Sequence, residues 1–277
     1  MELLAPAKLN LFLNVGSKRD DGFHEFQSVM TKVSLYDRIT VTESDDITVK
    51  CPGGPEQEEN IAWKAAALLR DSLAPGKGCS ITIEKTIPTG GGLGGGSSDA
   101  ASVLTALNSI WGINAGIKQL EEIGSRLGSD VNFFLHPGGC LAEGRGEIIN
   151  PLPLNRGPIK NILIVAPGIE VSTGKIYAKY RPGRLTAHGE LDKIIYDYRT
   201  GRWSSILRND LEETVFADYP SLKDIRESLA EWGTEPLLSG SGSCLFAVTE
   251  NREHAEIASG RLQALYGCKS WIADEII

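Results

Sequence analysis

The sequence lacks a long apolar run, clustered cysteines and a signal-peptide pattern. None of its apolar stretches approaches the ~20 residues that a membrane-spanning helix needs, so we expect no membrane partner. The five cysteines are scattered and form neither a CxxC pair nor a Cys/His group with zinc-ligand spacing, which favours reduced, mostly buried thiols. The N-terminal residues MELLAPAKLNLFLNVG contain no basic region followed by an apolar run and a cleavage site. Together these absences predict a cytoplasmic protein.

Basic residues are in the minority. Lysine and arginine number 28 against 36 aspartates and glutamates, which gives a formal net charge of −8 at pH 7. A nucleic-acid-binding surface is normally basic, so this balance argues against nucleic acid as the main partner. The length of 277 residues and the hydrophobic fraction of 41% suffice for one large domain or two of ordinary size.

Glycine is concentrated in one stretch. Residues 88–101 have the sequence PTGGGLGGGSSDAA, in which only Leu93 interrupts the glycines from position 90 to position 96. A glycine-rich turn between a strand and a helix exposes consecutive backbone N–H groups, and the helix N-terminus adds partial positive charge. We therefore predict a phosphate-binding loop and attribute the exclusion of side chains to a bound triphosphate. Ser97 and Ser98 are expected to cap the helix and to offer hydroxyls to a phosphate or to Mg²⁺.

Two common nucleotide-binding motifs do not describe this loop. The Walker A pattern requires a lysine after its last glycine, whereas Gly96 is followed directly by Ser97. The dinucleotide pattern GxGxxG matches at Gly90, Gly92 and Gly95, but a match within so dense a glycine run carries little information. A Rossmann unit also places a strand and an acidic residue about twenty residues further on, where this chain has a second helical pattern. We therefore exclude a nicotinamide site.

Strand and helix patterns alternate along the chain. Period-2 alternation predicts strands at KLNLFLNV, SVMTKVSL, RITVTE, DITVKC and CSITIE, and later at NILIVA, on both sides of SGSGS, and at KSWIADEI. Apolar stripes predict helices at ENIAWKAAALLRDSL, SSDAASVLTALNSI, IKQLEEIGSRL, SLKDIRESLAEW and REHAEIASGRLQALY. Three prolines and a glycine interrupt the pattern over residues 150–160, so we predict domains at residues 1–155 and 156–277. The alternation predicts an α+β fold.

Several segments resemble those of the GHMP kinases, a family of small-molecule kinases named for galactose, homoserine, mevalonate and phosphomevalonate. PTGGGLGGGSSDAA is similar to the PxxxGLGSSAA loop of that family, and its extended form GGGLGGGSS is typical of one branch. The same branch has segments similar to APAKLNLFLNV, DGFHEFQSVM, LGSDVNFFL and LSGSGSCLFA, which occur here in the same order along the whole chain. The resemblance implies a two-domain α+β fold, with an N-terminal ribosomal-protein-like α/β domain, a C-terminal ferredoxin-like α/β sandwich and the site between them.

The resemblance also implies an activity. Members of this branch use ATP and Mg²⁺ to phosphorylate the 2-hydroxyl group of a methylerythritol unit attached to cytidine diphosphate, a step of non-mevalonate isoprenoid precursor synthesis. We therefore expect an ATP-dependent small-molecule kinase whose partner is a cytidine diphosphate conjugate. The sequence leaves open the oligomeric state and the metal ligands.

Residue roles follow from the matched motifs. By resemblance, Asp130 accepts the proton of the substrate hydroxyl, while Lys8 favours the ionised carboxylate and stabilises the charge that forms on the alkoxide and the γ-phosphate. Phe23 is expected to stack on cytosine and His24 to bind its polar edge. The other expected contacts are with ATP at Pro88, Thr89, Gly90, Gly91, Gly92, Leu93, Gly94, Gly95, Gly96, Ser97, Ser98, Asn60 and Lys85, with the acceptor at Asn10, Thr173 and Tyr177, and with the loop from Ser239, Gly240, Ser241 and Gly242.

These residues also have simpler explanations. Lys8 fits an outward-facing surface lysine, since Leu9, Leu11, Leu13 and Val15 form the apolar face of its strand. Asp130 and Asn60 fit helix caps, the Phe23-His24 pair fits core residues, and SGSGS fits a hairpin turn. The family usually has tyrosine where Phe23 stands and proline where Asn132 stands, which puts one hydrogen bond and one turn in doubt.

Three other functions compete with the expected one. The first is a different GHMP-type kinase, for a sugar, homoserine or mevalonate, which would have no cytosine to stack on Phe23. The second is a non-catalytic nucleotide sensor, which needs the glycine loop and neither Lys8 nor Asp130. The third is an RNA-binding module, since a ribosomal-protein domain shares the N-terminal fold, but the net charge of −8 opposes it.

Overall fold

The computed structural model describes residues 1–181 and 183–277. Within these residues, eight strands form a first sheet, in which β3-β4-β2-β1-β8 is the main path, β5 and β12 pair with β2, and β6 pairs with β5. Its strands are β1 (Glu2–Lys18), β2 (His24–Ser44), β3 (Ile47–Lys50), β4 (Gly78–Glu84), β5 (Cys140–Glu143), β6 (Ile148–Pro151), β8 (Arg208–Asn209) and β12 (Glu275–Ile276).

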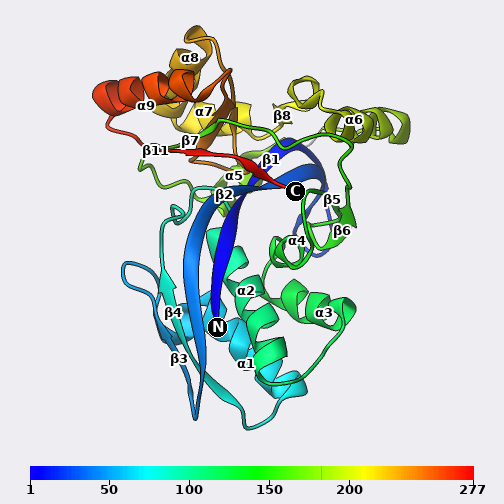
Figure 1. Ribbon diagram of the computed structural model, residues 1–277. Coiled ribbons are helices and arrows are strands. Elements are labelled where there is room, and N and C mark those ends of the chain that lie inside the picture. The colour runs from blue at the N-terminus through cyan, green and yellow to red at the C-terminus, as the bar shows by residue number, and fades with distance from the viewer. Residues whose placement is uncertain (182) are drawn as a thin grey trace.

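The two longest strands run through both halves of the molecule (Figure 1). The segments SVMTKVSL and RITVTE, expected as separate strands, form the single strand β2, because β2 pairs antiparallel with β1 along nearly its whole length. All residues of β1 from Ala7 to Val15 are buried, and their apolar side chains belong to two different hydrophobic cores, those from Ala7 to Phe12 to one and those of Leu13 and Val15 to the other. Alternation in the sequence therefore does not separate a buried face of β1 from an exposed one.

Four helices belong to the N-terminal half: α1 (Ile61–Leu73), α2 (Gly95–Ile110), α3 (Ile117–Leu127) and α4 (Val131–Leu135). The facing sides of α1 and α2 are rich in alanine, and these small side chains pack with the aliphatic residues of β2 and β4 in one core. The short helix η1 (Gln57–Glu59) precedes α1, whose first turn is capped by Asn60. This packing fixes the N-terminus of α2 directly after the glycine-rich loop.

The second sheet has the antiparallel order β11-β7-β10-β9. Its strands are β7 (Ile162–Ala166), β9 (Glu235–Leu238), β10 (Leu245–Val248) and β11 (Lys269–Ala273). The helices of this half are α5 (Thr173–Lys179), α6 (His188–Thr200), the short η2 (Trp203–Ile206), α7 (Glu212–Asp218), α8 (Pro220–Glu231) and α9 (Arg252–Tyr266). This strand order confirms the ferredoxin-like expectation, whereas α5, α6 and α7 were not predicted. α5 and α7 are only seven residues long, and the stripe of α6 at Leu191, Ile194, Ile195 and Tyr198 was missed.

The last strand returns to the first sheet. KSWIADEI, expected as one strand, divides into β11 and β12, and β12 pairs with β2 (Figure 1). Glu275 of β12 is buried and binds Arg156 at 2.6 Å, while Tyr198 and Thr31 each donate a hydrogen bond to it at 2.9 Å. The boundary between residues 155 and 156 stays a prediction, since β8 and β12 follow it in sequence and join the sheet that precedes it.

Two expectations from the sequence concern cysteine and membranes. All five cysteines are free and buried, and burial raises the pKa of the Cys79 thiol to about 11 and of the Cys140 thiol to about 12. In the described ranges, no helix combines the length and apolar character that a membrane span requires.

Candidate active site

Two adjoining cavities bring the predicted site residues together. The central cleft has a volume of about 710 Å³ and the loop cavity a volume of about 300 Å³, and both are lined by Gly92, Gly94 and Ser97. The central cleft is further lined by the predicted residues Lys8, Asn10, Phe23, His24, Asp130, Thr173, Tyr177, Gly240 and Ser241. The loop cavity is further lined by Asn60, Lys85, Pro88, Thr89, Gly90, Gly91, Leu93, Gly95 and Gly96. Of the predicted residues, Ser98, Ser239 and Gly242 line neither cavity.

Lys8 and Asp130 face each other in the central cleft. Lys8 Nζ lies 3.6 Å from Asp130 Oδ2, and the Lys8 side chain is only 5% exposed while that of Asp130 is 29% exposed. The surface-lysine explanation of Lys8 is therefore wrong. Asp130 precedes α4 but its side chain makes no capping hydrogen bond there, so the helix-cap explanation is wrong as well. The pair therefore consists of a buried ammonium group and a carboxylate that is partly exposed in the cleft.

Asn10 orients Lys8. Its side-chain oxygen accepts a hydrogen bond from Lys8 Nζ, and its Nδ2 donates to Ser28 Oγ at 2.8 Å. The Ser28 hydroxyl in turn donates to the Phe12 carbonyl at 2.7 Å. This buried chain of hydrogen bonds holds the Lys8 ammonium toward the cleft. Ser28 was not predicted, because only the pairing register of β1 and β2 brings it beside Asn10.

The glycine loop leads directly into α2. Gly94 is the N-cap residue of this helix in the left-handed conformation, with φ of 70°, and no side chain caps the helix. The expectation that Ser97 and Ser98 cap α2 is therefore wrong, because both lie inside its first turns. Ser97 lines both cavities, whereas Ser98 is fully buried and its hydroxyl has no hydrogen-bond partner in the described residues. A role of Ser98 in binding ATP stays a prediction.

Part of the glycine requirement comes from the protein itself. A Cβ atom at Gly92 would lie 2.0 Å from the Ser239 carbonyl oxygen, and one at Gly91 would lie 2.4 Å from Cys244 Sγ. Two hydrogen bonds hold the same contact: Cys244 N donates to Gly91 O at 3.1 Å, and Ser239 Oγ donates to Gly92 O at 3.1 Å. The interpretation that a triphosphate alone excludes side chains from this loop is thus wrong for Gly91 and Gly92.

Lys85 and Asn60 are engaged in the wall of the loop cavity. Lys85 Nζ lies 2.8 Å from Asp99 Oδ2 and 2.5 Å from Asp37 Oδ2. Asp37 also accepts hydrogen bonds from the backbone N–H groups of Thr86 and Ile87, which fixes the chain that enters the loop. Burial raises the pKa of the Asp99 carboxyl to about 7, although Lys85 opposes the shift. Sequence reasoning missed Asp37 and Asp99, which lie 48 and 14 positions from Lys85.

Asn60 is a helix cap that also borders the loop cavity. Its Oδ1 accepts a hydrogen bond from Ala62 N at 2.9 Å, and its Nδ2 donates to Pro55 O at 2.8 Å. The helix-cap explanation is therefore correct. A contact between Asn60 and adenine stays a prediction.

Aromatic residues form the other end of the central cleft. His24 is 9% exposed, and its ring centroid lies 5.4 Å from that of Tyr177 and 6.4 Å from that of Tyr180. Phe23 is 49% exposed, so it is not a core residue, and the Arg145 guanidinium lies 5.2 Å from its ring centroid. Tyr180 and Arg145 were not predicted, since neither lies in a matched motif.

The turn between β9 and β10 closes the cleft from the second sheet. Thr173 and Ser241 share a hydrogen bond of 2.7 Å between their hydroxyls, and both line the cleft. Gly240 lies beside Lys8 and Asn10, since a Cβ atom built at Gly240 would be 3.4 Å from Lys8 Nζ and from Asn10 Oδ1. The segment SGSGS is a hairpin turn between β9 and β10, so its simpler explanation is correct. The same turn also contacts the glycine loop through Ser239 and Gly92.

The remaining polar groups include hydrogen-bonded pairs but form no larger cluster of metal-ligand type in the part of the chain that the structure describes. Across residues 1–181 and 183–277, no three His, Cys, Asp or Glu side chains are grouped closely enough to hold a metal ion. His136 Nε2 lies 2.7 Å from Glu121 Oε1, and His254 Nε2 lies 2.8 Å from the Trp232 carbonyl oxygen.

Comparison with known proteins identifies the family. The model described as "GHMP kinases N terminal domain" matches residues 60–138, and the model described as "GHMP kinases C terminal" matches residues 191–268. A Pelobacter propionicus protein named 4-diphosphocytidyl-2-C-methyl-D-erythritol kinase is 40% identical over 268 residues, which cover 95% of this chain and 94% of that protein. The chain belongs to the GHMP kinase family. The expectation of a kinase is thereby confirmed.

Solved structures of GHMP kinases have the same fold. A crystal structure of 4-(cytidine 5'-diphospho)-2C-methyl-D-erythritol kinase matches with a TM-score of 0.82 and 35% identity over 100% of both chains. The homoserine kinase of Cytophaga hutchinsonii matches with a TM-score of 0.75 over 100% of this chain and 94% of that one, but it is only 18% identical. The second likeness therefore extends to the fold alone.

Proposed function

We propose that this GHMP kinase transfers the γ-phosphate of ATP to the 2-hydroxyl group of 4-diphosphocytidyl-2-C-methyl-D-erythritol. The observation that carries the proposal is the position of the Lys8–Asp130 pair, 3.6 Å apart in the central cleft that also contains Phe23 and His24. Gly94 and Ser97 border both this cleft and the loop cavity. An acceptor hydroxyl beside Asp130 would therefore lie near phosphates held by the glycine loop.

Asp130, Lys8 and the first turn of α2 have different roles in the proposed phosphoryl transfer. Asp130 accepts the proton of the acceptor hydroxyl, and Lys8 stabilises the negative charge that develops on the oxygen and on the phosphoryl group. The first turn of α2 offers backbone N–H groups that have no partner within the helix, and these bind phosphate oxygens. Transfer of this kind depends mainly on alignment and charge neutralisation, which these groups supply.

ATP and Mg²⁺ fit this loop. Gly90 has a φ of 71° and no atom within 4 Å of an added Cβ, so its backbone is open to a ligand. When bound, ATP supplies the phosphoryl group, and Mg²⁺ neutralises part of its charge. Of the three residues that line both cavities, Ser97 is the one with a hydroxyl group, and we propose it as the hydroxyl nearest the metal. The cytoplasmic location expected from the sequence stays a prediction, as do the absence of a nucleic-acid partner and the oligomeric state.

We propose that the aromatic end of the cleft binds cytosine. Phe23 is half exposed and open to stacking, and the neighbouring His24 is buried with its ring 5.4 Å from that of Tyr177. The phenylalanine lacks the hydroxyl that the family usually has here, so the stacking face is kept without that hydrogen bond. Asn132 stands where the family usually has proline, and it donates hydrogen bonds to Ser125 Oγ and to the Glu147 carbonyl. These hydrogen bonds hold the segment after Asp130, where a proline would restrict the backbone itself.

A panel of acceptors tests the proposed function. In an ATP-consumption assay with Mg²⁺, we expect turnover of the cytidine conjugate and none of mevalonate, homoserine or galactose. Replacing both Phe23 and His24 by alanine should raise KM for the conjugate by about 5- to 150-fold, since stacking on a base is worth about 1–3 kcal/mol. Leu265→Ala, at an exposed apolar residue of α9, is the matched control. Turnover of another acceptor would keep the family and contradict the proposed substrate.

The affinity for the conjugate should depend on pH through His24. Burial, together with the charge of Lys18, lowers the pKa of His24 below its usual 6.5, so the imidazole is neutral at pH 7 and has one acceptor nitrogen. As pH falls through that lowered pKa, the ring gains a proton, loses the acceptor and becomes harder to keep buried. We expect calorimetric affinity to be constant above the usual histidine pKa of 6.5 and to fall as the pH drops below it. His24→Gln should remove this dependence, and an unchanged pH profile in that variant would contradict the assignment.

A further inference from the structure

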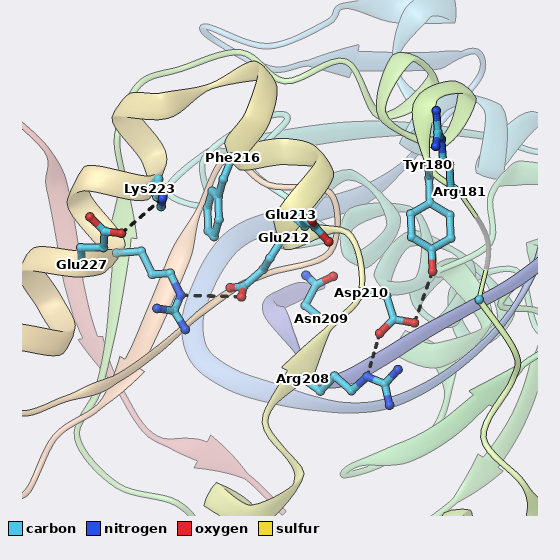
Figure 2. Close-up of a pocket in the computed structure, with 12 residues that line it drawn as sticks. Tyr180, Arg181, Arg208, Asn209, Asp210, Glu212, Glu213, Phe216, Lys223 and Glu227 are labelled. Atoms are coloured by element: carbon cyan, nitrogen blue, oxygen red, sulfur yellow. Dashed lines mark hydrogen bonds and ion pairs between the residues drawn. The ribbon is translucent and has the colours of Figure 1, made fainter.

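A third cavity lies behind the central cleft. This outer cavity has a volume of about 590 Å³ and lies between β8, α7 and α8 (Figure 2). Most of the charges on its wall are paired with each other: Arg208 with Asp210, Arg226 with Glu212, and Lys223 with Glu227. Because these charges balance one another, its wall does not favour a ligand of either sign. Its importance lies in Asn209 of β8 and Asp210 after it, which line this cavity and also bind residues of the central cleft, Gly240 and Tyr180.

Asn209 holds the turn that supports the glycine loop. It is 6% exposed, and its Nδ2 donates to the carbonyl oxygens of Leu238 at 2.8 Å and of Gly240 at 2.7 Å. Its Oδ1 accepts a hydrogen bond from Leu211 N at 2.9 Å, so the amide is fixed in orientation. Between the two bound carbonyls stands Ser239, whose hydroxyl donates to Gly92 O. Asn209 therefore contacts the loop that we propose to bind ATP indirectly, because it binds the two neighbours of Ser239 and Ser239 binds Gly92.

Asp210 binds residues at the aromatic end of the central cleft. Its Oδ2 accepts hydrogen bonds from Asn14 Nδ2 at 2.6 Å and from Val15 N at 3.0 Å, at the end of β1 away from Lys8. The Tyr180 hydroxyl donates to Val15 O at 3.0 Å and lies 3.4 Å from the same Asp210 oxygen, and Figure 2 shows Asp210 between Tyr180 and Arg208. Tyr180 lines the central cleft, and its ring faces the edge of His24.

We propose that Asn209 and Asp210 are positioning residues for two different subsites. Asn209 sets the turn against the phosphate-binding loop, and Asp210 sets Tyr180 in the wall of the base-binding end. The parallel pairing of Leu13 with Asn209 anchors both residues to β1, the strand that carries Lys8 and Asn10. This inference rests on the proposed function. It adds to that function two residues that touch neither substrate.

The chemistry of the two contacts makes their effects separable. Asn209 acts on Leu238 and Gly240 through two N–H donors, and Asp210 acts on β1 and Tyr180 through a single carboxylate oxygen. Exchange of the two side-chain types therefore tests both without changing volume. Asn209→Asp places an oxygen against two carbonyl oxygens, and Asp210→Asn places an amide where three donors converge in the native protein. Alanine at either position removes the contact without adding repulsion.

The test combines steady-state kinetics with calorimetric binding of the non-hydrolysable ATP analogue AMP-PNP and, separately, of the cytidine conjugate. For Asn209→Asp and Asn209→Ala we expect KM for ATP and Kd for AMP-PNP to rise at least about fivefold, since each lost buried hydrogen bond weakens the arrangement by about that factor. Affinity for the conjugate should stay within about twofold. For Asp210→Asn and Asp210→Ala we expect the reverse pattern, and Asn150→Asp and Asp71→Asn, at exposed residues, serve as controls.

A merely structural role gives a different result. Equal losses in both affinities, or a lower Tm with unchanged affinities, would overturn the inference. If the unsubstituted protein binds AMP-PNP but neither binds nor phosphorylates the conjugate, the proposed substrate fails and the Asp210 half falls with it. The AMP-PNP measurements then still decide whether Asn209 positions the phosphate-binding loop.

Discussion

Asp130→Asn should reduce kcat by about 10²- to 10⁴-fold, the usual contribution of a general base. The amide keeps the volume of the carboxylate and cannot accept the proton of the acceptor hydroxyl. Asp130 makes no capping hydrogen bond to α4, so the helix should not be weakened. Steady-state assays with ATP, Mg²⁺ and the cytidine conjugate measure the loss, and the melting temperature reports on the fold.

Binding measurements separate this loss from damage to the site. The variant should bind AMP-PNP and the conjugate within a few-fold of the unsubstituted protein, because the proposed role concerns the transition state. Asp224→Asn, at an exposed residue of α8, is the matched control. A kcat within about tenfold of the original would show that another group accepts the proton, since general-base catalysis is rarely worth so little. Retained ATP binding in the absence of any acceptor turnover, by the unsubstituted protein itself, would favour a nucleotide sensor.

Gly92→Ala should lower both stability and affinity for ATP. Gly92 has a φ of 78°, and its new Cβ would lie 2.0 Å from the Ser239 carbonyl oxygen and 3.2 Å from the Gly242 carbonyl oxygen. The left-handed backbone costs a side chain about 1–2 kcal/mol, and overpacking adds about 1–3 kcal/mol. We therefore expect the free energy of unfolding to fall by about 2–5 kcal/mol. Urea denaturation measures this loss, and AMP-PNP calorimetry measures the shift of the loop.

Gly90→Ala provides a control within the same loop. Gly90 also has a positive φ, of 71°, but no atom lies within 4 Å of a Cβ built there. This variant should lose only the backbone contribution of about 1–2 kcal/mol. The difference between the two variants therefore isolates the contact with the turn between β9 and β10. Equal losses would mean that this contact does not hold the loop in solution.

The sequence located the parts of the site better than their surroundings. The glycine loop could be found because its composition is unusual, and the helix after it because its apolar residues recur at helical spacing. The positions of Lys8 and Asp130 came from motif resemblance, since alternation alone made Lys8 a surface residue. Burial of both faces of β1 reversed that interpretation, and it depends on elements far away in sequence.

The partners of the site residues could not be predicted. Lys85 is bound by Asp37 and Asp99, and Gly92 packs against Ser239, which lies 147 positions away. The contact of Gly92 with Ser239 is set by how the two sheets meet, and the contacts of Lys85 by the packing of β2, β4 and α2, and no local pattern encodes either. For the same reason Asn209 and Asp210 had no place among the expected residues, although they bind segments at both ends of the cleft.

The sequence by itself determined the α+β class and the family to which the chain belongs, because hydrophobic periodicity and motif residues can be recognised from residue order alone. The phosphate-binding role of the glycine loop stays a prediction. Only the tertiary structure decided which glycines pack against other parts of the protein, as Gly92 does, and which have open space around them, as Gly90 does, since a missing side chain looks the same in either case. It also decided that Lys8 is buried beside Asp130, because the burial of a charge depends on what the rest of the chain places around it.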